Sequence, residues 1–244
     1  RKKIFTIDHD YINKLCDRDV GIGADGFILL EEDLAKKDVL YFVNYFNSDG
    51  YPSSFCGNGS MCAAHFAVNH NVTFGLKSGL FSTREGVFSF ELNGTKASIS
   101  MLDVSVFDFH DHNVIINTGS PHYVTFNFNL DGLDVNKKGK KIRFSEPFVL
   151  DGGVNVTFAS LKKNMIYIRT YERGVEAETL SCGTGAVAAV LSAFILGLTD
   201  QKNIIVKTLG GDCLVNFEKK INHFYNIWLT SNVEKNFEQD LSSY

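Results

Sequence analysis

The sequence lacks most features of secreted, membrane-bound and nucleic-acid-binding proteins. Its 244 residues carry a formal net charge of only −4 and no basic patch, which argues against a nucleic-acid partner. Five cysteines form an odd set without the spacing of a disulfide scaffold, so we expect free thiols in a reducing compartment. The longest apolar run, 186–198, contains Ser192 and is too short to span a bilayer. No signal-peptide pattern follows Arg1, and we expect a cytoplasmic protein with no membrane partner.

Two patterns that could indicate a bound group are weak. Cys56, Cys62, His65 and His70 are zinc-ligand types, but their spacing matches neither Cys-x2-Cys nor His-x3-His, so we predict no metal site. Residues 21–26 fit G-x-G-x-x-G, yet a helix is expected before them and a strand after them. A dinucleotide-binding unit has the reverse order, so we predict a tight turn there and no cofactor.

The informative feature is a repeat that contains two of the cysteines. Cys56 begins the sequence Cys-Gly-Asn-Gly, and Cys182, about half a chain length later, begins Cys-Gly-Thr-Gly. An alanine-rich run follows each copy, and Asn58 and Thr184 are good helix-capping types. The repeat therefore predicts a duplicated unit in which each copy places a cysteine at the start of a helix.

This arrangement favours proton transfer at a carbon beside a carboxylate. A thiol near a helix N-terminus ionises more readily to the thiolate, the form that can take a proton, because the free N–H groups there stabilise negative charge. The same N–H groups form an anion site for a carboxylate. Two such cysteines can remove a proton from one face of a carbon and deliver one to the other. By contrast, we interpret Cys16, Cys62 and Cys213 as small apolar core residues.

The remaining pattern indicates an α+β fold made of two similar halves. Helices are expected at 12–17, 60–70 and 186–198, and an Asn-Gly pair at Asn93 predicts a hairpin. The expected strands are 27–30, 39–43, 87–92, 97–101, 114–116, 124–126, 154–158 and 165–169. We predict a mostly antiparallel sheet around one central helix, built twice, with domains 1–113 and 114–234 and the ligand between them.

Six motifs in order resemble the diaminopimelate epimerase family. Besides the two cysteine motifs, the matching segments are 17–26, 44–50, 118–124 and 171–175, and Asn155 within 153–156 also fits. The resemblance implies cofactor-independent conversion of L,L- into meso-2,6-diaminopimelate, in lysine and peptidoglycan precursor biosynthesis. It implies that Cys56 and Cys182 alternate as thiolate base and thiol acid. It also implies that residues 235–244 return to the first domain as a strand.

The resemblance also implies the substrate-binding residues. The amides of Gly57, Asn58, Gly183 and Thr184 would hold the reacting carboxylate. Asn47, Asn155 and Arg173 match positions that bind the distal amino-acid end, and Ser120, also expected to bind substrate, stands where many relatives have asparagine. Glu172 would receive an ammonium. His122 matches a histidine lining the pocket, where proton handling and a structural role remain open.

The sequence departs from the family pattern in three places. No Gly-Asn-Asp-Phe turn precedes Arg1, so the family's first strand is expected to be missing. The spacing between Arg173 and Cys182 is one residue longer, near Glu176, and the tail around Asn232 lacks Gly-Pro-Ala.

Two other functions and the oligomeric state remain open. A proline or hydroxyproline racemase would share the fold, although such relatives carry Cys-Gly-His-Gly where this chain has Asn58. A non-catalytic paralogue would bind an amino acid without turning it over. A homodimer is one alternative for the assembly.

Overall fold

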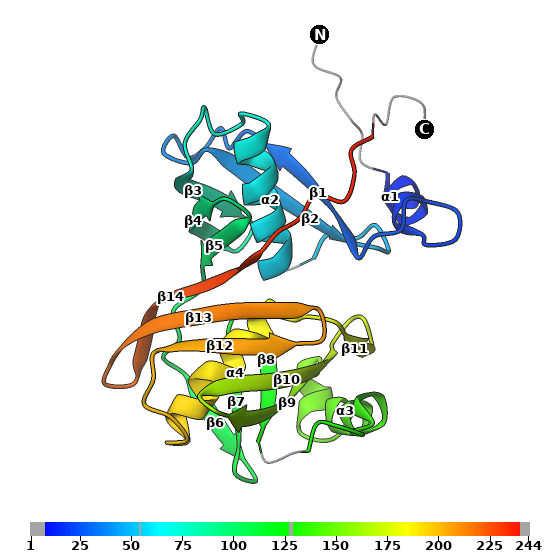
Figure 1. The fold of residues 1–244 in the computed structure, drawn as a ribbon. Coiled ribbons are helices and arrows are strands. Elements are labelled where there is room, and N and C mark those ends of the chain that lie inside the picture. The colour runs from blue at the N-terminus through cyan, green and yellow to red at the C-terminus, as the bar shows by residue number, and fades with distance from the viewer. Residues whose placement is uncertain (1–7, 54, 127–128, 240–244) are drawn as a thin grey trace.

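The computed structural model describes residues 8–53, 55–126 and 129–239 (Figure 1). The helices are α1 (His9–Cys16), α2 (Gly57–Asn69), α3 (Val135–Arg143) and α4 (Gly183–Ile195), with a short 3-10 turn, η1 (Phe148–Asp151). The strands of the first half are β1 (Gly26–Glu31), β2 (Tyr41–Asn47), β3 (Ser78–Thr83), β4 (Gly86–Asn93) and β5 (Lys96–Ser100). Those that follow are β6 (Phe107–His110), β7 (Asn113–Asn117), β8 (Pro121–Thr125), β9 (Asn155–Lys162), β10 (Met165–Glu172), β11 (Ala177–Thr179), β12 (Asn203–Thr208), β13 (Gly211–Lys220) and β14 (His223–Asn232).

A continuous curved sheet connects the two halves. Its strand order is β1-β2-β3-β4-β5-β14-β13-β12-β10-β9-β8-β7-β6, with β11 added beside β10. Most neighbours are antiparallel, and the parallel pairs are β2–β3, β8–β9 and β10–β12. Strand β14 joins the halves, because it pairs with β5 on one side and β13 on the other. The predicted α+β fold class is therefore confirmed.

One apolar helix lies inside each half of the sheet. Helix α2 packs on β1, β2, β4, β5 and β14, and α4 packs on β7–β10 and β12–β14. Alanines at 63, 64 and 67 let the strands approach α2 closely. Helix α4 is more enclosed, since every residue from Gly183 to Ala193 is buried. A helix that is apolar on all sides is stable only in such a core.

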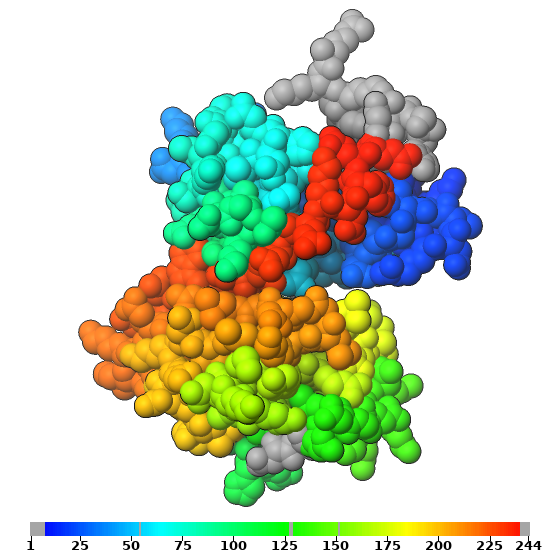
Figure 2. Space-filling model, in the orientation of Figure 1, coloured from blue at the N-terminus to red at the C-terminus, as the bar shows by residue number. Residues whose placement is uncertain are grey.

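The structure differs from the expected organisation at two places. The hairpin of β6 and β7 spans the predicted boundary at residue 113, and that division of the chain remains a prediction. The return strand expected at 235–244 is not seen in residues 235–239, and residues 240–244 lie outside the described ranges. The crossing is made earlier by β14, after which the Val233 N–H donates to the Thr95 carbonyl at 2.8 Å. Figure 2 shows this C-terminal segment, in red, lying across the first half.

Candidate active site

Each repeated cysteine caps a helix. Cys56 precedes α2 with φ −113° and ψ 111°, and Cys182 precedes α4 with φ −123° and ψ 109°. Asn58 and Thr184, expected as caps, instead lie in the first helical turn, two residues after the cap. The thiols themselves are therefore placed beside the free N–H groups of the two helix starts.

The glycines of the repeat explain why the two helix starts can meet. A Cβ on Gly183 would lie 3.6 Å from the Gly57 Cα and 2.8 Å from Leu229 Cδ2, and one on Gly57 would lie 3.1 Å from the same methyl group. Leu229 belongs to β14, the strand that joins the halves. The Asn58 side-chain amide donates to the Ser181 carbonyl at 3.2 Å, which ties one start to the other.

The second glycine of each motif makes room for sulfur. A Cβ on Gly59 would lie 3.4 Å from Cys56 Sγ, and a Cβ on Gly185 would lie 3.2 Å from Cys182 Sγ. Glycine at these positions lets each thiol fold back over its own helix start. The repeat Cys-Gly-x-Gly thus serves two contacts: helix start against helix start, and sulfur against backbone.

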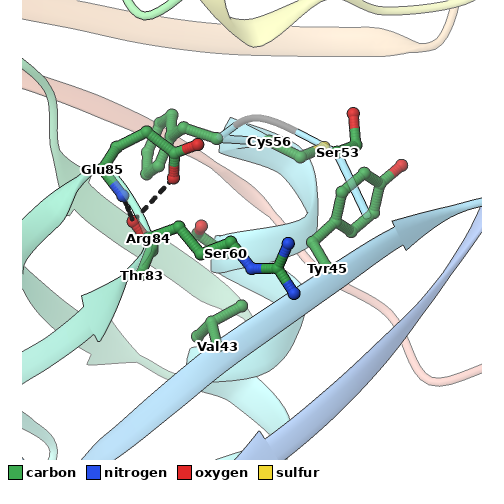
Figure 3. A pocket seen from close by; sticks show the side chains of 9 residues that line it. Val43, Tyr45, Ser53, Cys56, Ser60, Thr83, Arg84 and Glu85 are labelled. Carbon is green, nitrogen blue, oxygen red and sulfur yellow. Dashed lines mark hydrogen bonds between the residues drawn. The ribbon is translucent and has the colours of Figure 1, made fainter. Parts of the chain in front are cut away.

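Cys56 is half-buried and accepts hydrogen bonds. Its sulfur accepts the Gly59 N–H at 3.3 Å. Burial raises the pKa of the Cys56 thiol, and the charge of Glu172 adds to this, while the Gly59 N–H and the Tyr45 hydroxyl oppose it. Figure 3 shows Cys56 and Tyr45 in a pocket whose other labelled residues come from β2, the loop between β2 and α2, α2, the end of β3 and the β3–β4 turn. Arg84 and Glu85 of that turn line the pocket.

Cys182 is buried beside a carboxylate. Burial raises the pKa of the Cys182 thiol, and the neighbouring charge of Glu172 raises it further. Burial also raises the pKa of the Glu172 carboxyl, against the hydrogen bonds it receives from Thr179 and Cys182. The Thr179 hydroxyl donates to Glu172 Oε1. Glu172 is thus close enough to both thiols to influence their protonation.

His122 connects to Cys182 through a threonine. The imidazole is fully buried, with Nε2 2.9 Å from Thr184 Oγ1 and Nδ1 3.1 Å from Thr157 Oγ1. Thr184 Oγ1 in turn lies 3.5 Å from Cys182 Sγ. Burial, helped by the charge of Arg173, lowers the pKa of His122 to about 3. A neutral imidazole therefore orients the Thr184 hydroxyl beside the thiol.

Of the residues expected around the distal end of the substrate, Ser120, Asn155 and Arg173 are connected by hydrogen bonds, and Asn47 lies apart from them on β2. Asn155 Oδ1 accepts the backbone N–H of Arg173 at 2.8 Å, and its amide donates to Ser120 Oγ at 2.6 Å. Arg173 Nη1 donates to the Gly153 carbonyl at 3.4 Å. Asn47 ends β2, opposite Gly26 of β1, on the same strand as Tyr45.

Sequence similarity to curated proteins identifies the family of this chain. A diaminopimelate epimerase from Flavobacterium psychrophilum is 41% identical over 229 residues, covering 93% of this chain and 87% of the relative. The chain belongs to the diaminopimelate epimerase family. A second relative of that name, from Aquifex aeolicus, is 37% identical and covers 96% of this chain and 85% of its own length. The sequence model of the diaminopimelate epimerase family matches residues 114–228.

Solved structures with the same fold are more distant than these epimerase relatives. A hydroxyproline epimerase from Agrobacterium vitis superimposes with a TM-score of 0.64 at 12% identity, covering 91% of this chain and 76% of that one. A PhzF-family phenazine biosynthesis protein from Bacillus anthracis gives a TM-score of 0.63 at 13% identity, covering 92% and 86%. At such identities the likeness establishes the fold alone.

Two bound groups were considered from the sequence, a zinc ion and a dinucleotide, and the described residues support neither. Within the described residues, no three or more His, Cys, Asp or Glu side chains gather as a metal site would require. The glycine-rich segment 21–26 lies between α1 and β1, in the order opposite to a dinucleotide-binding unit. In the same part of the chain, no helix is both long and apolar enough to cross a membrane.

Several residues that contact the expected site residues could not be found from the sequence. Tyr45 reaches Cys56 from β2, Thr179 holds Glu172, and Thr157 holds His122. Tyr45 and Thr179 lie within or close to segments that resemble the family, but their contacts join separate elements: β2 with the start of α2, and β11 with β10. Leu229, which contacts both helix starts, gave no local signal because it reads as one apolar residue in a strand.

Proposed function

We propose that this protein interconverts L,L- and meso-2,6-diaminopimelate by a two-base reaction in which Cys56 and Cys182 transfer the protons. The observation that carries the proposal is the contact of two cysteine-capped helix starts at Gly57 and Gly183. An α-carbon held at that contact has one thiol toward each face. Family membership supplies the substrate, since the curated relatives are named for it.

The helix starts would bind the reacting carboxylate. The amides of Gly57, Asn58, Gly183 and Thr184 lie in the first turns of α2 and α4, where N–H groups lack helical partners. As the α-proton leaves, negative charge spreads from the carbon into the carboxylate. Oriented N–H donors and two helix dipoles stabilise that charge in a site with little water.

Proton transfer would begin at whichever thiol is ionised. One thiolate takes the α-proton and becomes a thiol, and the opposite thiol donates its proton to the other face and becomes a thiolate. The two residues therefore exchange roles after each turnover. Both resting thiol pKa values are raised by burial, so ionisation depends on what the substrate brings. An ammonium paired with Glu172 would remove the negative charge that now opposes thiolate formation.

The distal end would be bound by the group around Arg173. A planar guanidinium can pair with a carboxylate through two parallel hydrogen bonds. Asn155 and Ser120 are hydrogen-bonded to each other beside Arg173 and would complete this end, with Asn47 on β2. A proline-type substrate has no distal carboxylate, so this group favours diaminopimelate over a proline or hydroxyproline racemase activity.

Exchange of the α-hydrogen in heavy water tests the proposal. The chain is incubated with L,L-diaminopimelate, L-proline or trans-4-hydroxy-L-proline in D₂O, and deuterium at the α-carbon is followed by NMR. We expect incorporation and formation of the meso isomer with diaminopimelate alone. Incorporation only into proline or hydroxyproline would indicate a racemase, and binding without incorporation would indicate a non-catalytic paralogue. The Cys56→Ala/Cys182→Ala double variant is the matched blank.

A further inference from the structure

Arg143, the last residue of α3, fastens two loops of the second half to each other. Its Nη1 donates to the Gly152 carbonyl at 2.8 Å, in the loop before β9. Its Nε and Nη2 donate to Glu176 Oε1 at 3.2 and 3.0 Å, in the turn between β10 and β11. Although α3 is otherwise rich in exposed lysines, the Arg143 side chain is only 11% exposed.

Two glycines make room for this arrangement. A Cβ on Gly153 would lie 1.2 Å from Arg143 Nη1, so only glycine leaves space for the guanidinium. Gly139, inside α3, would place a Cβ 2.4 Å from the Cβ of Tyr171. Glycine within a helix costs about 1 kcal/mol relative to alanine. Here it allows α3 to lie directly on β10, which brings Arg143 within reach of both loops.

Glu176 is held by more than the arginine. Its Oε1 also accepts the Gly174 N–H at 3.0 Å, and its Oε2 accepts the Tyr171 hydroxyl at 3.2 Å. Its backbone has φ +57°, a left-handed conformation that is unfavourable for residues with a side chain. Glu176 lies in the segment where we expect one residue more than the family pattern between Arg173 and Cys182. This turn carries a carboxylate that four donors hold in place.

Both contacts of Arg173 lie in the segments that Arg143 fastens. The Arg173 guanidinium donates to the carbonyl of Gly153, next to the carbonyl of Gly152 that Arg143 holds. The Arg173 backbone N–H donates to Asn155 Oδ1, two residues further along, where that loop ends and β9 begins. On its other side, Arg173 leads directly into the turn that Glu176 closes.

We propose that Arg143 and Glu176 are positioning residues that fix Arg173 for the distal carboxylate, and so set the affinity for diaminopimelate without touching it. This role rests on the proposed function, because it requires Arg173 to bind that carboxylate. A purely structural ion pair between the same residues would support folding alone. The two roles differ in whether a substitution acts through Arg173.

The test compares KM and kcat of five variants with the parent chain. Arg143→Ala should raise KM for diaminopimelate about 10-fold, the usual scale for losing hydrogen bonds to a charged group, with kcat changed less than about 3-fold. Arg143→Lys should recover part of this loss, because an ammonium can still reach one acceptor. Glu176→Gln, which keeps a carbonyl acceptor, should be milder than Glu176→Ala. Lys141→Ala, on the same exposed turn of α3, is the matched control and should change neither constant.

A double-mutant cycle with Arg173→Lys decides between the two roles. If Arg143 acts through Arg173, Arg143→Ala should lower kcat/KM less than about 2-fold further once Arg173→Lys is present. Fully additive losses, or an unchanged KM in a folded Arg143→Lys variant, would overturn the positioning role. The parent chain is assayed first. A parent without diaminopimelate turnover contradicts the proposed function itself, whereas an active parent with additive variants contradicts the positioning role alone.

Discussion

The two cysteine-capped helix starts share a backbone but differ in what surrounds the sulfur. Cys56 is half-buried, and its sulfur accepts hydrogen bonds from the Gly59 N–H and the Tyr45 hydroxyl. Cys182 is buried against the Glu172 carboxyl and the Thr184 hydroxyl. The repeated glycines therefore set the geometry of both thiols, while Tyr45 and Glu172, which lie outside the repeat, make their surroundings differ.

Within the proposed reaction, this difference would give the two thiols unequal resting roles. Hydrogen-bond donors favour the charged form of a group, and a nearby like charge disfavours it. Both sulfurs accept a backbone N–H and a hydroxyl, and the charge of Glu172 acts against the thiolate of both, but only the Cys182 thiol is also hydrogen-bonded to the Glu172 carboxyl, which favours its protonated form. We infer that Cys56 is the thiol more readily ionised in the substrate-free protein, and that Cys182 begins as the acid.

The largest expected effect comes from removing one thiol at a time. Cys56→Ala and Cys182→Ala should each lower epimerisation about 10²–10⁴-fold, the usual contribution of a general acid or base. Each variant keeps the thiol facing one side of the α-carbon. In D₂O, any remaining exchange should therefore favour opposite stereoisomers in the two variants. Chiral chromatography and NMR of recovered diaminopimelate measure both quantities.

The serine variants serve as controls for this pair. A hydroxyl can still carry a proton, so Cys56→Ser and Cys182→Ser should retain more activity than the alanine variants. Near-normal epimerisation in both alanine variants would mean that the repeated cysteines are structural. The same stereoisomer preference in both would contradict their placement on opposite faces.

The parts of the fold that were predictable from the sequence are those with local signals. Glycine and alanine patterns located α2 and α4, and the Asn-Gly pair at Asn93 located the β4–β5 hairpin. The cysteines were identified because their motifs repeat. Helix α3 was missed because it has few apolar residues and a glycine at 139. Its stability comes from the Asp134 cap and from packing on Tyr171, and only the second requires the folded chain.

Contacts between distant segments were not predictable in the same way. Tyr45 and Cys56 meet across elements, and Glu172 approaches both thiols only after β10 has paired with its neighbours. The crossing by β14 depends on antiparallel register with β5, which no local pattern in residues 223–232 encodes. Family resemblance supplied Glu172, His122 and Arg173, but their hydrogen-bond partners required the structure.

A smaller effect is expected from filling the space between the helix starts. Gly183→Ala should be the more harmful change, because its Cβ would lie 2.8 Å from buried Leu229 Cδ2, compared with 3.1 Å for Gly57→Ala. Overpacking of this kind lowers the free energy of unfolding by about 1–3 kcal/mol. Urea unfolding and kcat/KM should both rank the variants in this order. Combining Gly183→Ala with Leu229→Val should restore part of the activity, and failure to do so would place the conflict elsewhere.

The smallest expected effect is a dependence of stability on pH. It involves the start of α4 and not that of α2, because the His122 imidazole contacts Thr184 and not Asn58. The pKa of His122 is about 3 in the folded protein, below its ordinary value of 6.5, so the unfolded chain binds the extra proton. The contribution of His122 to the free energy of unfolding is therefore fully present above pH 6.5. It decreases by about 1.4 kcal/mol per pH unit as pH falls from 6.5 toward 3. Urea unfolding at pH 7.5 and 5.5 should show this loss in the parent chain and a smaller one in His122→Gln. Equal losses in both would mean that the imidazole is not held neutral beside Thr184, and the two helix starts would then respond to acid alike.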